Sequence, residues 1–170
     1  RGVVGLAAYD AGARPATGER PSVWPDLILA RYPAMLVFDH EAMTVEAVGR
    51  GVDAPASEAA CRQAVAWLAE VVEPARPEPP SETLEAEAGA DAYRGAVADV
   101  VERIAAGDLF QANIARGWTG RLNRDADPFD VFLRLAAGGG SAFAAFWRIG
   151  DRALVSNSPE LFLTWNPADA

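Results

Sequence analysis

A glutamate near the end of the chain has the neighbours that acid chemistry requires. Pro159 restricts the backbone just before Glu160, and the apolar run Leu161–Leu163 follows it directly. Such a run predicts that the segment enters the interior, where loss of hydration favours the protonated form of a carboxyl group. A carboxyl group kept protonated in this way can act as a general acid. The alternative is an ionised glutamate at a strand edge, in contact with water.

Two amide side chains form a second candidate site. Residues 109–115 alternate, so that a strand there would place Gln111 and Asn113 on one face and apolar side chains on the other. Amides on a shared face can bind a polar ligand. They can equally hydrogen-bond to loops or water on a half-exposed sheet, and the spacing leaves both readings open.

A helix must position these amides. Apolar side chains from Asp91 onward recur at three- and four-residue steps, which predicts an amphipathic helix. Asp91 can cap its first turn, and Gly107 suits the left-handed conformation that commonly ends a helix. The apolar positions of this helix are Tyr93, Ala96, Val97, Val100, Val101 and Ile104.

Two longer runs carry a family resemblance. Residues 104–115 read Ile-Ala-Ala-Gly-Asp-Leu-Phe-Gln-Ala-Asn-Ile-Ala, and residues 155–163 read Val-Ser-Asn-Ser-Pro-Glu-Leu-Phe-Leu. The first resembles the helix-to-strand signature of the chorismate-utilising enzymes, specifically the large components of aminodeoxychorismate synthase and anthranilate synthase. The second is similar to the Ser-Pro-Glu segment of that family. The resemblance implies an α+β fold, mainly antiparallel sheet with flanking helices, as part of an anthranilate synthase component I-like chorismate-binding fold.

The same resemblance implies roles for the candidate residues. Glu160 matches the acid that protonates the departing 4-hydroxyl of chorismate. Gln111 stands where relatives that add water carry a lysine base, and since glutamine is no base, the branches that add ammonia are favoured. Asn113 favours aminodeoxychorismate synthase, because the anthranilate branch more often has an aliphatic residue there. Gln111 and Asn113 are thus the expected substrate-binding residues.

The implied reaction yields 4-amino-4-deoxychorismate, on the way to p-aminobenzoate and folate. Its implied partners are chorismate and a glutamine amidotransferase subunit or domain that supplies ammonia. The implied cofactor is Mg²⁺, with ligands expected beyond Ala170. Anthranilate synthase component I, which serves tryptophan biosynthesis, and a non-catalytic binding domain on the same scaffold are the alternatives.

A tryptophan pocket is a further implied feature. Residues 141–146 fall where the family has a proline-aromatic segment that lines such a pocket. Here Ala142 replaces the proline and Phe143 supplies the aromatic ring. The missing proline leaves the presence of the pocket open.

Composition limits the classes of partner. The net charge of −9 argues against a nucleic-acid surface or an anionic membrane surface, because phosphate groups require a basic cluster that the sequence lacks. The single cysteine, Cys61, cannot form an internal disulfide, which favours the reducing cytoplasm. Its position on an apolar helical face indicates a packed thiol. The lone histidine, His40, indicates a turn residue rather than a metal ligand.

The remaining elements give three expected regions: a sheet portion over 1–73, a Pro/Glu-rich linker over 74–90 that holds neither helix nor sheet, and the first part of the catalytic region over 91–170. Because the chain opens on Arg1 inside a strand pattern and stops soon after another, we expect an interior piece of a longer enzyme, inactive by itself. Strands are further expected over 3–9, 26–30, 32–39, 44–49 and 161–165, with a loop over 12–25 and a turn over 39–41. A helix capped by Ser57 is expected over 57–72, and another is expected to begin at Asp127-Pro128. Strands over 141–149 and 153–155 are expected around a Gly150-Asp151 turn.

Overall fold

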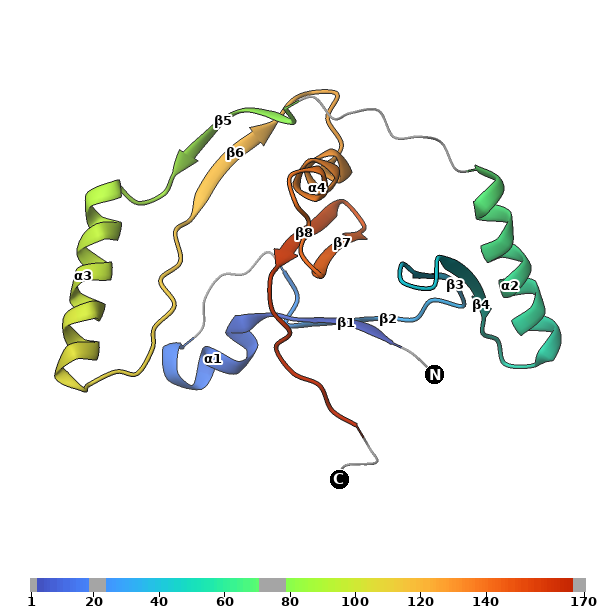
Figure 1. Ribbon diagram of the computed structural model, residues 1–170, viewed down its shortest axis with the longest axis horizontal. Coiled ribbons are helices and arrows are strands. Elements are labelled where there is room, and N and C mark those ends of the chain that lie inside the picture. Colours follow the sequence, from blue (N-terminus) through green and yellow to red (C-terminus); the bar gives the residue numbers. More distant parts are fainter. Residues whose placement is uncertain (1–2, 19–23, 71–78, 167–170) are drawn as a thin grey trace. The chain divides into compact units, whose positions relative to one another are not determined.

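The computed structural model describes residues 3–18, 24–70 and 79–166. The chain divides into two compact units, Arg1–Glu73 and Pro74–Ala170. The described residues form antiparallel strand pairs and α-helices, so the expected α+β fold is confirmed (Figure 1). In the part of the chain that the structure describes, the strands form four separate two-stranded pairs.

The described residues of the first unit form two strand pairs and two α-helices. Strand β1 pairs with β2, and β3 pairs with β4 through the expected turn after Asp39. The Asp39 carboxylate accepts hydrogen bonds from the backbone N–H groups of Glu41 and Ala42, at 2.9 and 2.8 Å, which fixes this turn. The elements are β1 (Val4–Ala7), α1 (Tyr9–Thr17), β2 (Leu27–Ala30), β3 (Ala34–Asp39), β4 (Thr44–Gly49), α2 (Ala54–Trp67) and the 3-10 helix η1 (Leu68–Glu70).

Two predictions for this unit need correction. The loop expected over 12–25 instead includes most of α1, which an ion pair between Arg14 and Asp26 ties to β2. Helix α2 begins three residues before Ser57, because the Asp53 side chain caps it by accepting the Ala56 N–H at 2.8 Å. Pro55 is accepted in that first turn.

Small residues let α2 lie directly on the β3–β4 pair. The buried residues of this contact are Ala34, Ala60 and Ala64, with Leu36 and Ala47 packed beside them. A methyl group on Gly49 would lie 2.0 Å from the Ser57 carbonyl oxygen, so the glycine is required for this close approach. The Cys61 thiol donates to the Ala47 carbonyl at 3.4 Å and is half-buried, as expected for a packed cysteine.

The other two strand pairs found among the described residues lie in the second unit. Strand β5 pairs with β6, and β7 pairs with β8 in a hairpin that turns at Gly150-Asp151 as predicted. Gly150 has a φ of 61°, a conformation that favours glycine. The elements are β5 (Ser81–Ala86), α3 (Ala90–Ala106), β6 (Trp118–Leu122), α4 (Pro128–Ala137), β7 (Phe143–Ile149) and β8 (Arg152–Ser158).

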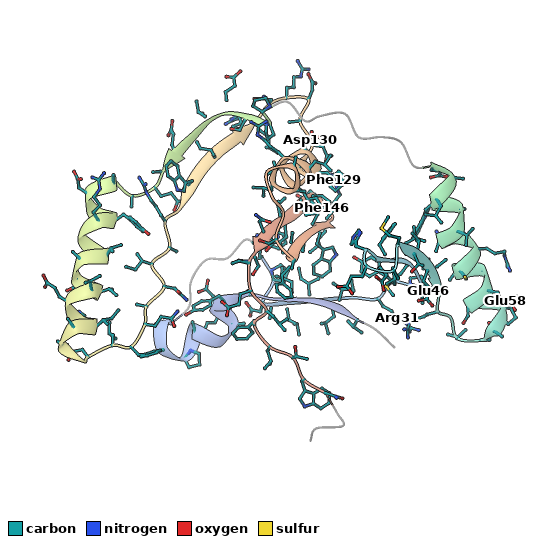
Figure 2. All side chains as sticks on the ribbon, in the orientation of Figure 1. Arg31, Glu46, Glu58, Phe129, Asp130 and Phe146 are labelled. Carbon is teal, nitrogen blue, oxygen red and sulfur yellow. The ribbon has the colours of Figure 1, made fainter. Side chains whose placement is uncertain are left out.

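Helix α4 packs on the β7–β8 hairpin. Its predicted start is confirmed: Asp127 accepts the Phe129 N–H at 2.7 Å, and Asp130 accepts the Asp127 N–H at the same distance. Phe129 on α4 lies against Phe146 on β7 (Figure 2). These contacts fix the helix above the hairpin.

Other predictions for this unit are wrong. Strand β5 lies within 74–90, where neither helix nor sheet was expected, although the division into domains remains a prediction. Helix α3 ends at Gly107 as predicted, but its N-cap is Gly89 and Asp91 instead pairs with Arg94 at 2.7 Å. Residues 109–115 and 161–165 form no strand. A strand needs a hydrogen-bonding neighbour, and the described part of the chain offers none to either segment.

Candidate functional site

The chain leaves β8 through Pro159 and Glu160. The Ser158 hydroxyl donates to the Glu160 carbonyl oxygen at 3.2 Å, which fixes the backbone at that point. The Glu160 side chain is exposed, and the following apolar side chains are uncovered, with Phe162 fully exposed at 100% and Leu163 at 73%. The expected burial of this segment is therefore wrong for the described residues. The role of Glu160 as an acid stays a prediction.

The amides of Gln111 and Asn113 lie between α3 and β6. Both side chains are exposed, in a segment without regular structure. The shared strand face on which their pairing was predicted is absent from this segment. Their role in substrate binding stays a prediction.

The predicted tryptophan-pocket residues lie at the open end of the β7–β8 hairpin. Phe143 is the first residue of β7 and pairs with Ser158, while Ala142 is exposed just before it. Two residues after Ser158 comes Glu160. The register therefore brings the Ala142-Phe143 segment beside the segment that carries the candidate acid.

An asparagine that the sequence analysis missed joins these two segments. The Asn157 Oδ1 atom accepts the Ser141 N–H at 2.9 Å, and the Ser141 hydroxyl donates to the Asn157 carbonyl at 3.3 Å. The signal was available in part: a two-residue turn at Gly150-Asp151 fixes the register of both strands, and so places Asn157 beside the start of β7.

Arg116 was also missed. Its guanidinium lies 4.5 Å from the centre of the Trp118 ring and 6.0 Å from that of Tyr93, and it donates to the Ala88 carbonyl at 3.3 Å. Its Nε atom is buried without a hydrogen-bond partner among the described residues. These contacts connect the first turn of α3 to the start of β6, where the segment that carries the two amides ends.

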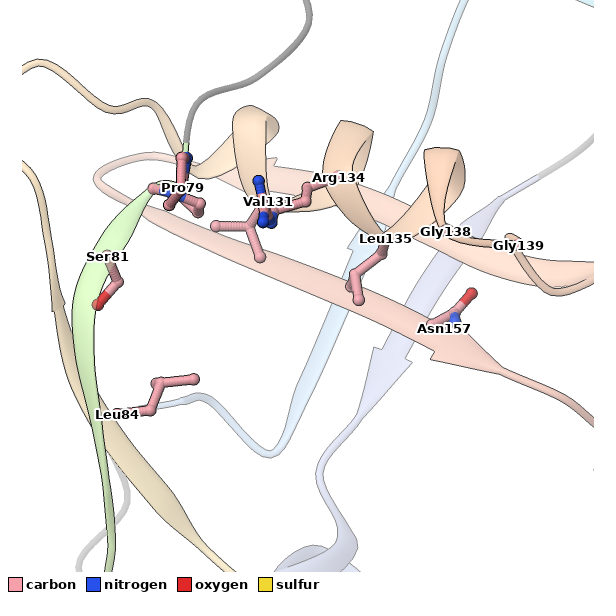
Figure 3. Close-up of a pocket in the computed structure, with 10 residues that line it drawn as sticks. Pro79, Ser81, Leu84, Val131, Arg134, Leu135, Gly138, Gly139 and Asn157 are labelled. Atoms are coloured by element: carbon pink, nitrogen blue, oxygen red, sulfur yellow. The ribbon is translucent and has the colours of Figure 1, made fainter.

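A cavity of about 520 Å³ lies in the second unit, between β5, α4 and β8 (Figure 3). Its lining is mainly apolar, from Leu84, Val131 and Leu135, with Arg134 and Asn157 as polar members. Asn157 thus lies at one side of the cavity and at the hairpin's open end. None of the predicted site residues lines this cavity.

Candidate metal ligands are dispersed over the described residues. Within 3–18, 24–70 and 79–166, no group of three or more His, Cys, Asp or Glu side chains could hold a metal ion. His40 lies in the turn between β3 and β4. None of the helices described is both long and apolar enough to cross a membrane.

Known proteins with similar sequences fall into two named groups. Aminodeoxychorismate synthase component 1 of Escherichia coli K12 is 27% identical over 167 residues, which cover 95% of this chain and 35% of that protein. Anthranilate synthase component 1 of Thermus thermophilus is 28% identical over 172 residues, which cover 95% of this chain and 36% of that protein. The chain thus spans about a third of the length of these curated relatives.

A solved structure shares the fold. The crystal structure of anthranilate synthase component I from Streptococcus pneumoniae TIGR4 matches with a TM-score of 0.67 and 22% identity, over 94% of this chain and 38% of that one. The sequence model described as chorismate binding enzyme matches residues 1–169. Because that match covers nearly every residue, the chain belongs to the chorismate binding enzyme family.

Proposed function

We propose that this chain is part of an aminodeoxychorismate synthase component I, which replaces the 4-hydroxyl of chorismate with an amino group. Family membership supports the substrate. The amination branch is supported by three relatives named aminodeoxychorismate synthase component 1, which are 26–28% identical over 95–99% of this chain. Gln111 supports it too, because a glutamine cannot serve as the base that water addition requires.

The observation that carries the proposal is the position of Glu160 at the open end of the β7–β8 hairpin. There Ser158 holds its backbone by the 3.2 Å hydrogen bond, and strand β8 precedes it. Hydroxide is a poor leaving group, so its departure requires a positioned proton donor. Glu160 would protonate the 4-hydroxyl, which leaves as water, while the entering ammonia loses one proton as the carbon–nitrogen bond forms.

A protonated Glu160 requires shielding from water, which the described residues do not provide. Leu161 and Trp165 are 53% and 71% exposed, and Phe162 has no covering contact. In the proposal, further chain of a longer enzyme packs on this apolar segment and removes water from Glu160. The described residues do not fit a Mg²⁺ site, so Mg²⁺ would be held by other residues of that enzyme. An amidotransferase subunit or domain would supply the ammonia.

The test uses the full-length protein that carries this chain. It is incubated with chorismate, Mg²⁺ and ammonium, and the product is identified by mass and chromatography. Aminodeoxychorismate from the wild type, with loss of product in Glu160→Gln, is the expected result. Unchanged turnover in Glu160→Gln would exclude the glutamate as the acid.

Anthranilate synthase component I is the second candidate function. It is favoured by the Thermus thermophilus relative, whose identity of 28% matches that of the first group. The same incubation separates the two, because anthranilate and aminodeoxychorismate differ in mass. The absence of any turnover would instead support a binding domain on this scaffold.

A further inference from the structure

The backbone ladder of the β7–β8 hairpin stops just before Glu160. Its last residue pair is Phe143 and Ser158, at the end opposite the Gly150-Asp151 turn. Pro159 follows, and since proline has no N–H group it cannot donate a further ladder bond. The ends of β7 and β8 next to Glu160 therefore need contacts other than ladder hydrogen bonds to remain side by side.

Asn157 supplies those contacts at the open end. Its Oδ1 atom accepts the Ser141 N–H at 2.9 Å, and its carbonyl accepts the Ser141 hydroxyl at 3.3 Å. A backbone N–H can pair only with the amide oxygen, so this contact sets the orientation of the amide. Ser141 is also fixed from the β7 side, because its carbonyl accepts the Ala144 N–H at 3.0 Å.

The next residue of β8 continues the same set of hydrogen bonds. Ser158 donates from its hydroxyl to the Glu160 carbonyl at 3.2 Å. Neighbouring strand residues thus hold the two segments that leave the hairpin: Asn157 holds Ser141, and Ser158 holds Glu160. A shift of Ser141 away from β8 would loosen the Phe143–Ser158 pair, and with it the backbone from which Glu160 extends.

We propose that Asn157 is a positioning residue for Glu160, acting through its hydrogen bond to Ser141 at the hairpin's open end. This inference rests on the proposed function, in which Glu160 is the acid. Misplacement of a proton donor slows the chemical step more than it weakens ground-state binding. Loss of the bond should therefore lower kcat and leave KM nearly unchanged.

The experiment compares three variants of the full-length protein with the wild type. Asn157→Ala removes the acceptor, whereas Asn157→Asp keeps an oxygen at the same position. Asn123→Ala is the matched control, because the Asn123 side chain likewise bonds to the backbone beside a strand-pair end: it donates to the Pro79 carbonyl at 2.9 Å, next to the end of the β5–β6 pair. Hydrogen exchange at the Ser141 amide and kcat and KM for chorismate are measured for each protein.

The expected result is faster exchange at Ser141 in Asn157→Ala, with kcat about tenfold lower and KM within about twofold of the wild type. Asn157→Asp should restore both the protection and most of kcat. Equal kcat in Asn157→Ala and the wild type would overturn the inference. So would an equal loss of kcat in Asn123→Ala, since this would indicate general destabilisation.

A failure of the proposed function can be distinguished from a failure of the inference about Asn157. If the wild type forms anthranilate, the branch is wrong, but the kcat comparison is made on that product and still decides the role of Asn157. If Glu160→Gln keeps full activity, the acid assignment fails and the positioning role falls with it, whatever the exchange at Ser141 shows.

Discussion

Phe129 and Phe146 meet edge to face, with ring centres 4.9 Å apart and ring planes at 69°. Phe132 joins them from the same helix, with its ring centre 6.1 Å from that of Phe146. Phe146 therefore links α4 to the hairpin that carries the candidate acid. Edge-to-face pairs of this kind add to the gain from burial of the rings alone.

Phe146→Ala should lower the free energy of unfolding by about 2 kcal/mol, because it removes both ring contacts from a half-buried position. Urea denaturation followed by circular dichroism measures the change. Phe110→Ala is the control: that ring is 94% exposed, so its removal should alter stability by less than about 0.5 kcal/mol. Equal losses in the two variants would show that α4 is not held by this contact.

Gly49→Ala should destabilise the contact between α2 and the β3–β4 pair by about 1–3 kcal/mol. The added methyl group would lie 2.0 Å from the Ser57 carbonyl and 2.4 Å from the Cys61 nitrogen, both backbone atoms that can move only with the helix. The same denaturation experiment applies. Gly12→Ala in α1 is the control, because no atom lies within 4 Å of the position that its methyl group would take, and alanine favours a helix. An equal loss of stability in Gly12→Ala would refute the steric explanation.

The Asp127–Arg148 pair should make stability depend on pH. Hydrogen bonds from Arg148, and then from the Phe129 N–H, hold the pKa of the Asp127 carboxyl below its ordinary value of 3.8. A lowered folded-state pKa means that the ionised form stabilises the fold above about pH 4, and that this stabilisation is lost as the pH falls through the folded-state pKa. Unfolding midpoints between about pH 6 and pH 2 measure the loss.

Asp127→Asn isolates the charge in that experiment, because asparagine also caps helices. The variant should unfold more readily than the wild type at about pH 6 and differ less from it at about pH 2. Asp125→Asn, two residues away, serves as the matched control. A difference in unfolding midpoint between Asp127→Asn and the wild type that stays the same at every pH would contradict the role of the ion pair.

The sequence predicted best those elements that short-range chemistry determines. Asp127 followed by Pro128 defines the start of α4, and Gly150-Asp151 defines the β7–β8 turn, so no distant contact is needed to find them. Helix α1 was missed because Gly12 and Pro15 both disfavour a helix interior. Its ion pair from Arg14 to β2 is a tertiary contact that composition does not show.

The site was harder to predict than the fold. The pattern over 109–115 is that of a strand, but alternation creates a strand only where a neighbouring strand completes the ladder, and β6 lies further on. The prediction that the segment after Glu160 is buried failed for a related reason, since apolar residues require other residues to cover them. Asn157 was missed because its role depends on the register of two strands rather than on its neighbours in sequence.

Gln111→Lys should allow water to compete with ammonia in the full-length enzyme. Under the proposed function, glutamine leaves water without a base, whereas an amine placed there can take a proton from water as its oxygen attacks. Turnover of chorismate in ¹⁸O-water should therefore yield a labelled hydroxyl product in this variant and none in the wild type. Gln111→Met, similar in length but without a base, controls for the lost amide. An absence of label in a Gln111→Lys enzyme that still aminates chorismate would show that residue 111 does not face the incoming nucleophile.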